Sequence, residues 1–140
     1  MRNRQKLWLC LSLLCCFFLM FFPWFGFGRG VQEITGTVVL FHPVTIAGIV
    51  LTCIGIWLPG HGMARFLAPA GIAVILCTEL YFWLFWYVET ITGQWSLSDS
   101  IQGAYLECYL GMGCTLCTFI LSILFCVLPD AKHQRIKRLP

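Results

Sequence analysis

The chain has 140 residues, of which 59% are hydrophobic and 11% are charged. A soluble domain of this length has about a quarter charged residues, so an ordinary aqueous surface is excluded. The net charge of +3 comes from residues at the ends of apolar segments and in turns, which excludes a basic surface for nucleic acid. The composition therefore predicts an integral membrane protein with the lipid bilayer as a partner.

Four apolar segments follow one another along the chain, at residues 7–25, 38–58, 66–88 and 104–128. Each has roughly the 20 residues needed to cross about 30 Å of hydrocarbon as a helix. Because the bilayer core offers no water to backbone amides, spans of this kind must be helical. We therefore predict an all-α fold, a four-transmembrane-helix bundle in which residues 1–140 form a single membrane domain.

The orientation of the predicted bundle follows from its basic residues. Eight of the nine Lys and Arg residues flank the segments on one side, and only Arg29 lies on the other. The positive-inside rule predicts that both termini are cytoplasmic, and we expect the plasma membrane. The first segment also resembles a signal peptide, but the aromatic cluster at residues 21–27 is a poor cleavage context, so we expect it to be retained.

The two predicted outer loops resemble each other. Val31-Gln-Glu-Ile-Thr-Gly matches Val88-Glu-Thr-Ile-Thr-Gly at an offset of 57 residues. This similarity of residues 31–40 and 88–97 is either a tandem helix–loop–helix repeat or chance. Both loops contain β-forming residues, which favours a short extended segment in each, paired with its counterpart. Two irregular loops are the alternative.

Glu79 is the polar residue that lies deepest in an apolar segment. It is roughly nine residues, or about 14 Å, from the outer end of its segment. An ionisable group at that depth costs several kcal/mol unless it is paired, and no basic residue lies at a similar depth. Two interpretations stay open: Glu79 binds a proton or cation, or it is a neutral carboxyl hydrogen-bonded to another helix.

Small and polar residues recur every three or four positions near and along the fourth segment. They are Gly103, Glu107, Gly111, Cys114, Thr118 and Ser122. This spacing favours a helix-packing face, because small residues let two helices approach closely. The alternative is a polar pathway that runs along this face from Glu107 towards Glu79.

Aromatic residues gather at the outer end of the third segment and in the loop after it. They are Trp83, Trp86, Tyr87 and Trp95. Tyr and Trp commonly anchor helices at the membrane interface. Their density here also predicts a patch that faces lipid or a partner protein.

All nine cysteines lie within the apolar segments, where Cys usually acts as a small hydrophobic residue. Cys114 and Cys117 form a C-x-x-C pair. Four-helix membrane disulfide-exchange enzymes carry such a pair, and this chain resembles them in its number of spans. Those enzymes also need a second pair in an outer loop, and neither loop here contains Cys. The sequence has no group of residues at the spacing of metal ligands and no phosphate-binding loop. We therefore predict no cofactor, no metal and no enzyme activity.

Three functional hypotheses follow from these patterns. The favoured one is a non-enzymatic accessory or assembly subunit of a larger membrane complex, which binds another membrane protein through the helix-packing face and the aromatic patch. The first alternative is a small homo-oligomeric transporter or channel that uses Glu79. The second alternative is a membrane thiol–disulfide redox protein that uses Cys114 and Cys117.

Overall fold

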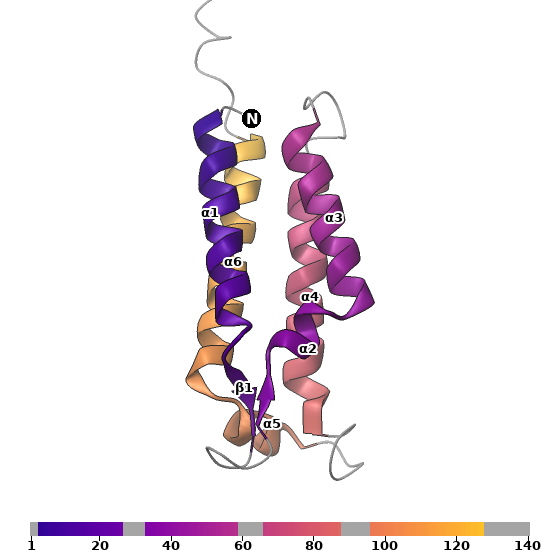
Figure 1. Cartoon of the computed structure of the whole chain (residues 1–140), viewed down its shortest axis with the longest axis vertical. Helices are drawn as coiled ribbons and strands as arrows, with labels where there is room; N and C mark the ends of the chain where they lie inside the picture. Colours follow the sequence, from indigo (N-terminus) through magenta and orange to yellow (C-terminus); the bar gives the residue numbers. More distant parts are fainter. Residues whose placement is uncertain (1–2, 27–32, 59–65, 88–95, 128–140) are drawn as a thin grey trace, which may run out of the picture.

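The structure is a computed structural model that describes residues 3–26, 33–58, 66–87 and 96–127. This part of the chain is mostly helical, with six helices and two short strands (Figure 1). In chain order the elements are α1 (Asn3–Leu19), β1 (Pro23–Phe25), β2 (Ile34–Thr35), α2 (Thr37–Leu40), α3 (Pro43–Trp57), α4 (Leu67–Tyr87), α5 (Leu97–Gly103) and α6 (Leu106–Val127).

Two of the described helices are long and apolar enough to cross a membrane, by length and composition. They are α4, with 20 qualifying residues, and α6, with 22. Pro69 lies in the first turn of α4, where its missing amide hydrogen costs little. Of the four predicted spans, these two are therefore found as single helices of sufficient length.

The first predicted segment, residues 7–25, is helical only as far as Leu19. Pro23 follows the helix, and proline disfavours a helical conformation for the residue before it. The indole Nε1 of Trp24 donates a hydrogen bond of 2.9 Å to the Leu19 carbonyl oxygen. This bond pairs one of the carbonyl groups that a helix end leaves without a partner, so the turn replaces the last predicted helical residues.

The second predicted segment, residues 38–58, is divided between α2 and α3. The division lies at His42, whose backbone is extended with ψ of 135°. Pro43 restricts His42 to that conformation and then occupies the first position of α3, which needs no amide hydrogen. As a result α3 has 15 residues rather than the 21 of the predicted segment.

The predicted extended segment of the first outer loop is found as β2, but its partner differs from the prediction. β2 pairs antiparallel with β1, with Pro23 opposite Thr35 and Phe25 opposite Ile34. The counterpart segment, residues 88–95, lies outside the described residues, as does part of the first loop, so the proposed repeat stays a prediction. Helix α5 was not predicted, and Ser96 caps it by accepting a hydrogen bond from the Asp99 amide.

The four longest helices lie side by side as two pairs. α1 packs against α6, α3 packs against α4, and contacts between α4 and α6 join the pairs. The start of α1 and the last turns of α3 and α6 lie at one end of the molecule, while β1, β2 and α5 lie at the other (Figure 1). We call these the N-terminal end and the strand end.

Glycine allows α3 and α4 to approach closely. A Cβ atom added to Gly48 would lie 2.8 Å from the carbonyl oxygen of Gly71 and 2.9 Å from Ile75. A backbone oxygen cannot rotate away from such an atom, so the two helices would have to separate. Small residues serve the same purpose between transmembrane helices.

We predict that Gly48→Ala lowers the free energy of unfolding by about 1–3 kcal/mol, the usual cost of overpacking. Unfolding in mixed detergent micelles, followed by circular dichroism, measures this. Gly113→Ala is the matched control, because an added Cβ there meets nothing within 4 Å. Equal stability of the two variants would contradict the close approach.

Candidate functional site

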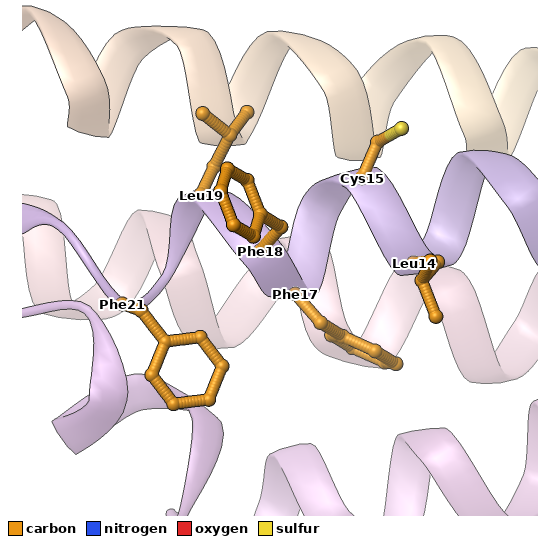
Figure 2. A pocket seen from close by; sticks show the side chains of 6 residues that line it. All are labelled: Leu14, Cys15, Phe17, Phe18, Leu19 and Phe21. Atoms are coloured by element: carbon orange, nitrogen blue, oxygen red, sulfur yellow. The ribbon is translucent and has the colours of Figure 1, made fainter.

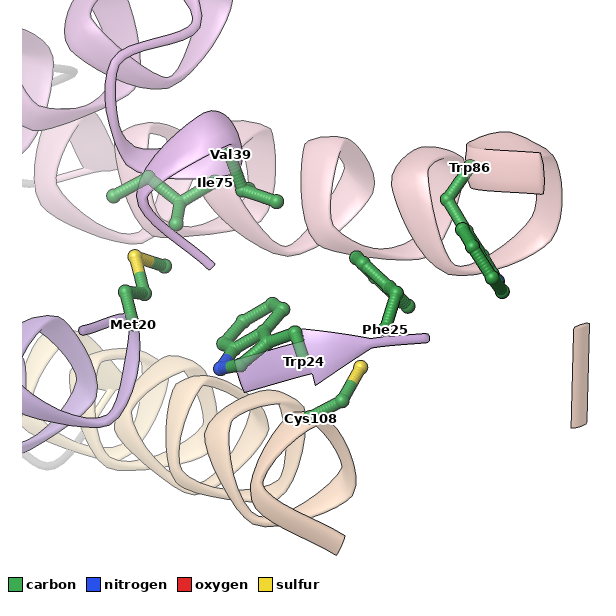
Figure 3. Close-up of a cluster of buried hydrophobic side chains, with 7 residues drawn as sticks. All are labelled: Met20, Trp24, Phe25, Val39, Ile75, Trp86 and Cys108. Carbon is green, nitrogen blue, oxygen red and sulfur yellow. The ribbon is translucent and has the colours of Figure 1, made fainter. Parts of the chain in front are cut away.

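A layer of four polar side chains lies in the interior between α1, α4 and α6. It consists of Cys16, Glu79, Thr115 and Thr118, each at most 1% exposed, and we call it the polar layer. Along α1 and α6 it lies between two apolar clusters. The cluster nearer the N-terminal end contains Leu9, Leu13, Ile56, Ala68 and Ile72. The cluster nearer the strand end contains Met20, Trp24, Phe25, Val39, Ile75, Trp86 and Cys108 (Figure 3).

Glu79 is bound to α6 by a hydrogen bond from Thr115. The Thr115 hydroxyl donates to Oε1 of Glu79 over 2.8 Å, and the side chain of Glu79 has no exposed surface. Oε2 is also buried and has no hydrogen-bond partner among the described residues. Within the described residues, Oε1 of this carboxyl therefore has a hydrogen-bond partner and Oε2 has none.

The surroundings of Glu79 favour a neutral carboxyl. In the described part of the chain the Lys and Arg residues are Arg4 and Lys6, both near the start of α1. An ionised carboxylate in a dry interior without a counterion is costly. Thr115 also lies 3.2 Å from the Gly111 carbonyl oxygen but has one proton to donate. The Thr115 hydroxyl therefore shares its one proton between Oε1 of Glu79 and the Gly111 carbonyl oxygen.

The remaining members of the polar layer, Thr118 and Cys16, have partners within α6 and between α1 and α6. The Thr118 hydroxyl donates to the Cys114 carbonyl oxygen at 2.8 Å. Cys16 Sγ lies 3.7 Å from the Thr118 hydroxyl oxygen. A hydroxyl that donates to a carbonyl oxygen one turn earlier in its own helix needs no partner on another helix. Two contacts in this layer therefore join different helices: Thr115 with Glu79 joins α6 to α4, and Cys16 with Thr118 joins α1 to α6.

The face of α6 that packs inwards shares Gly111, Thr118 and Ser122 with the predicted helix-packing face but differs from it at other positions. The buried residues of α6 are Cys108, Gly111, Thr115, Thr118 and Ser122. Glu107 and Cys114, which we predicted on this face, are partly exposed, and Gly103 belongs to α5. The extended backbone at Ala104, with ψ of 129°, explains why Gly103 is not part of α6. The face of α6 that turns inwards is the one against which the Trp24 ring packs, at Gly111.

Thr115 was missed by the sequence reasoning, although a signal for it was present. Residues 108, 111, 115, 118 and 122 also recur every three or four positions, as a helix face requires. Two neighbouring rows of small residues therefore compete on α6, and the spacing alone does not choose between them. The predicted pathway from Glu107 to Glu79 stays a prediction, and the Trp24 ring lies against Gly111 between their two levels.

Trp24 and Phe25 are buried, although they lie at the end of the first predicted segment, where aromatic residues commonly anchor a helix at the membrane interface. Trp24 has no exposed surface, and a Cβ atom on Gly36 or Gly111 would lie 2.7 or 2.5 Å from its ring. The backbone oxygen of Trp24 accepts a hydrogen bond of 2.9 Å from the Tyr105 amide. Trp24 therefore joins the end of α1 to the segments that begin α2 and α6.

The predicted aromatic patch is only partly on the surface. Trp86 is 3% exposed and stacks on Phe25 with ring centroids 5.3 Å apart (Figure 3), so it is unavailable to lipid or a partner. Trp83 is half-buried and meets the ring of Tyr109 edge to face. Trp95 and the side chain of Tyr87 lie outside the described residues.

The nine cysteines are all free thiols. Cys117 is exposed and Cys114 is partly exposed, and both line a groove between α1 and α6. A redox role for this pair stays a prediction. Within the described residues, no three His, Cys, Asp or Glu side chains are grouped as metal ligands would be.

We predict that Thr115→Val lowers the free energy of unfolding by about 1–3 kcal/mol, because it leaves a buried carboxyl without its donor. Thr115→Ser, which keeps the hydroxyl, should lose less. In the double variant Glu79→Met/Thr115→Val the loss should be smaller than the sum of the single losses. Additive losses in detergent unfolding would show that the two side chains do not interact.

Comparison with known proteins identifies no relative of this chain. No family model matches its sequence, no curated protein is similar to it, and no solved structure matches its fold.

Proposed function

We propose that this chain is a non-enzymatic membrane protein with four spans, which acts as an accessory or assembly subunit of a larger membrane complex. The observation that carries the proposal is that polar side chains are buried while many large apolar side chains are exposed on the helices, unlike in a water-soluble protein. Thr45, Thr52, Thr115, Ser122 and Glu79 are buried, while large apolar side chains are exposed along α1, α3, α4 and α6. Exposed apolar faces of this kind are stable against lipid or another apolar helix and are unfavourable against water.

The packing of the helices supports four spans rather than two. α1 and α3 lie alongside α6 and α4 (Figure 1), so a bilayer that contains the longer pair also surrounds the shorter helices. On α1, Leu14 is 69% exposed and Phe18 is 63% exposed, and on α3 Val50 is 51% exposed. A hollow of about 540 Å³ beside the second half of α1 is lined by Leu14, Cys15, Phe17, Phe18, Leu19 and Phe21 (Figure 2). Burying this surface in lipid is favourable by about 25 cal/mol per Å².

The strand end complements the shorter helices. At about 1.5 Å per residue, the part of α1 from Leu7 to Leu19 covers roughly 20 Å of a hydrocarbon core about 30 Å thick. The backbone beyond α1 is paired: Gly26 donates to Gly103, Gly36 to Phe22 and Tyr105 to Trp24. Non-helical backbone is tolerated near a membrane when its polar groups are satisfied within the protein.

The orientation follows from charge. Arg4 and Lys6 lie at the N-terminal end, and the remaining basic residues except Arg29 flank the spans on the same side. The positive-inside rule then places both termini in the cytoplasm. We retain the plasma membrane as the proposed location.

The partner-binding surface is the groove between α1 and α6 rather than the inward face that we first predicted. The groove measures about 540 Å³ and includes Trp8, Gly113 and Cys117. Gly113 and Cys117 are four residues apart, the spacing at which small residues admit a second helix. Because a Cβ atom added to Gly113 would meet nothing within 4 Å in the described part of the chain, packing within the chain does not require glycine at this position. An apolar helix of a membrane partner fits this surface.

We predict that Gly113→Leu reduces recovery of the partner at least ten-fold. The tagged protein is purified from its native membrane in mild detergent, and the complex is weighed by native mass spectrometry. Ala47→Leu, at an exposed position of α3, is the control for added bulk. Unchanged recovery from Gly113→Leu contradicts this surface, and a homo-oligomer without a second polypeptide contradicts the accessory function.

A small homo-oligomeric transporter or channel is the second candidate function, and the unpartnered Oε2 of Glu79 favours it. Such an oxygen is available to bind a proton or cation if the helices separate. Burial of Glu79 inside one chain and its bond to Thr115 favour a packing role instead. The two functions make opposite predictions for one substitution.

If the chain transports a proton or cation through this site, Glu79→Gln abolishes flux in proteoliposomes without changing expression or assembly. Thr118→Ser, in the same polar layer but away from the carboxyl, should keep its flux. Equal flux from Glu79→Gln and the parent protein would discard the transport function.

A further inference from the structure

We propose that the N-terminal end of the groove between α1 and α3 binds an anionic phospholipid, with its phosphate on Lys6 and an acyl chain between the two helices. This inference rests on the proposed membrane function, and it adds a specific ligand to it. The groove has a volume of about 450 Å³ and is lined by Asn3, Lys6, Leu7, Cys10, Ile56 and Trp57.

The groove is amphipathic along its length. Lys6 and Asn3 supply an ammonium and an amide at the N-terminal end, while Leu7, Cys10 and Ile56 are apolar. A phospholipid has the matching arrangement, with a charged headgroup joined to hydrocarbon. A soluble anion would make no contact with the apolar half of the groove, and a lipid without net charge would gain less from the ammonium of Lys6 than an anionic lipid would.

Trp57 positions the ammonium of Lys6. Nζ of Lys6 lies 5.6 Å from the centroid of the Trp57 ring, which is within the range of a cation–π interaction. Trp57 is the last residue of α3 and is 75% exposed, so its ring forms an open wall of the groove. The ammonium has three N–H donors, and its contact with the ring leaves donors for a phosphate.

The charge of Lys6 has no acidic partner in the described part of the chain. The acidic residues there are Glu33, Glu79, Asp99 and Glu107, and none forms an ion pair with it. Arg4 is exposed at the same end and adds to the positive potential. In the proposed orientation this end meets the cytoplasmic leaflet, where anionic lipids are concentrated. These features favour a lipid phosphate over a protein carboxylate.

The test compares lipids that differ only in headgroup. Full-length protein is reconstituted in nanodiscs with phosphatidylserine or phosphatidylcholine of identical acyl chains, and retained lipids are counted by native mass spectrometry. We predict a preference for phosphatidylserine that Lys6→Gln weakens about five-fold, the usual effect of one basic residue near anionic lipid. Lys6→Arg should restore the preference.

Two controls make the test specific for the groove. Arg4→Gln removes the same charge from α1 outside the groove, and its effect should be less than two-fold. Trp57→Leu should weaken the preference, whereas Phe66→Leu, at an exposed aromatic residue just before α4, should not. Equal effects of Lys6→Gln and Arg4→Gln, or equal retention of both lipids by the parent protein, would overturn the site. Failure of the parent protein to enter nanodiscs would instead contradict the membrane function.

Discussion

The indole of Trp24 occupies a space that exists because Gly36 and Gly111 have no side chains. Its ring lies between the segment before α2 and the inward face of α6, and its Nε1 pairs with the last carbonyl of α1. Its own backbone oxygen holds Tyr105, just before α6. One buried aromatic residue therefore sets where α1 ends, where α6 begins and which face of α6 turns inwards. The polar layer and the strand end both depend on that setting.

Two of the helix contacts in the interior, α3 with α4 and α4 with α6, differ in their chemistry. α3 and α4 approach through glycine, so their contact depends on shape and on dispersion between closely packed atoms. α4 and α6 are joined by the hydrogen bond from Thr115 to Glu79 as well as by apolar contacts such as that of Trp83 with Tyr109, so their contact includes a buried polar pair. A contact that depends on complementary shape is difficult to re-form with a different partner. A hydrogen bond is more readily re-formed with another polar group. The interface of α4 with α6 is therefore the place where a change of protonation would act.

The proposed functions assign different parts of the surface to different neighbours. The apolar faces of the long helices suit acyl chains, the groove containing Gly113 suits a partner helix, and Lys6 with Trp57 suits a lipid headgroup. Within the described residues, Oε2 of Glu79 is one of several buried side-chain polar atoms without a hydrogen-bond partner, and Oγ1 of Thr45 is another. This division explains why an accessory role accounts for more of the residues than transport does, since transport concerns one oxygen atom.

The sequence by itself determined the apolar segments, the depth of Glu79 and the extended segment at Ile34–Thr35, because these depend on composition and on local backbone preference. The ends of α4 and α6 fall close to the predicted limits for the same reason. Only the tertiary structure decided that Trp24 and Trp86 are buried, because an aromatic residue near a helix end has the same local pattern whether it faces lipid or the interior. It also decided between two adjacent rows of small residues on α6. Adjacent positions on a helix are about 100° apart, and the choice between them depends on what packs against the helix, which here is Trp24.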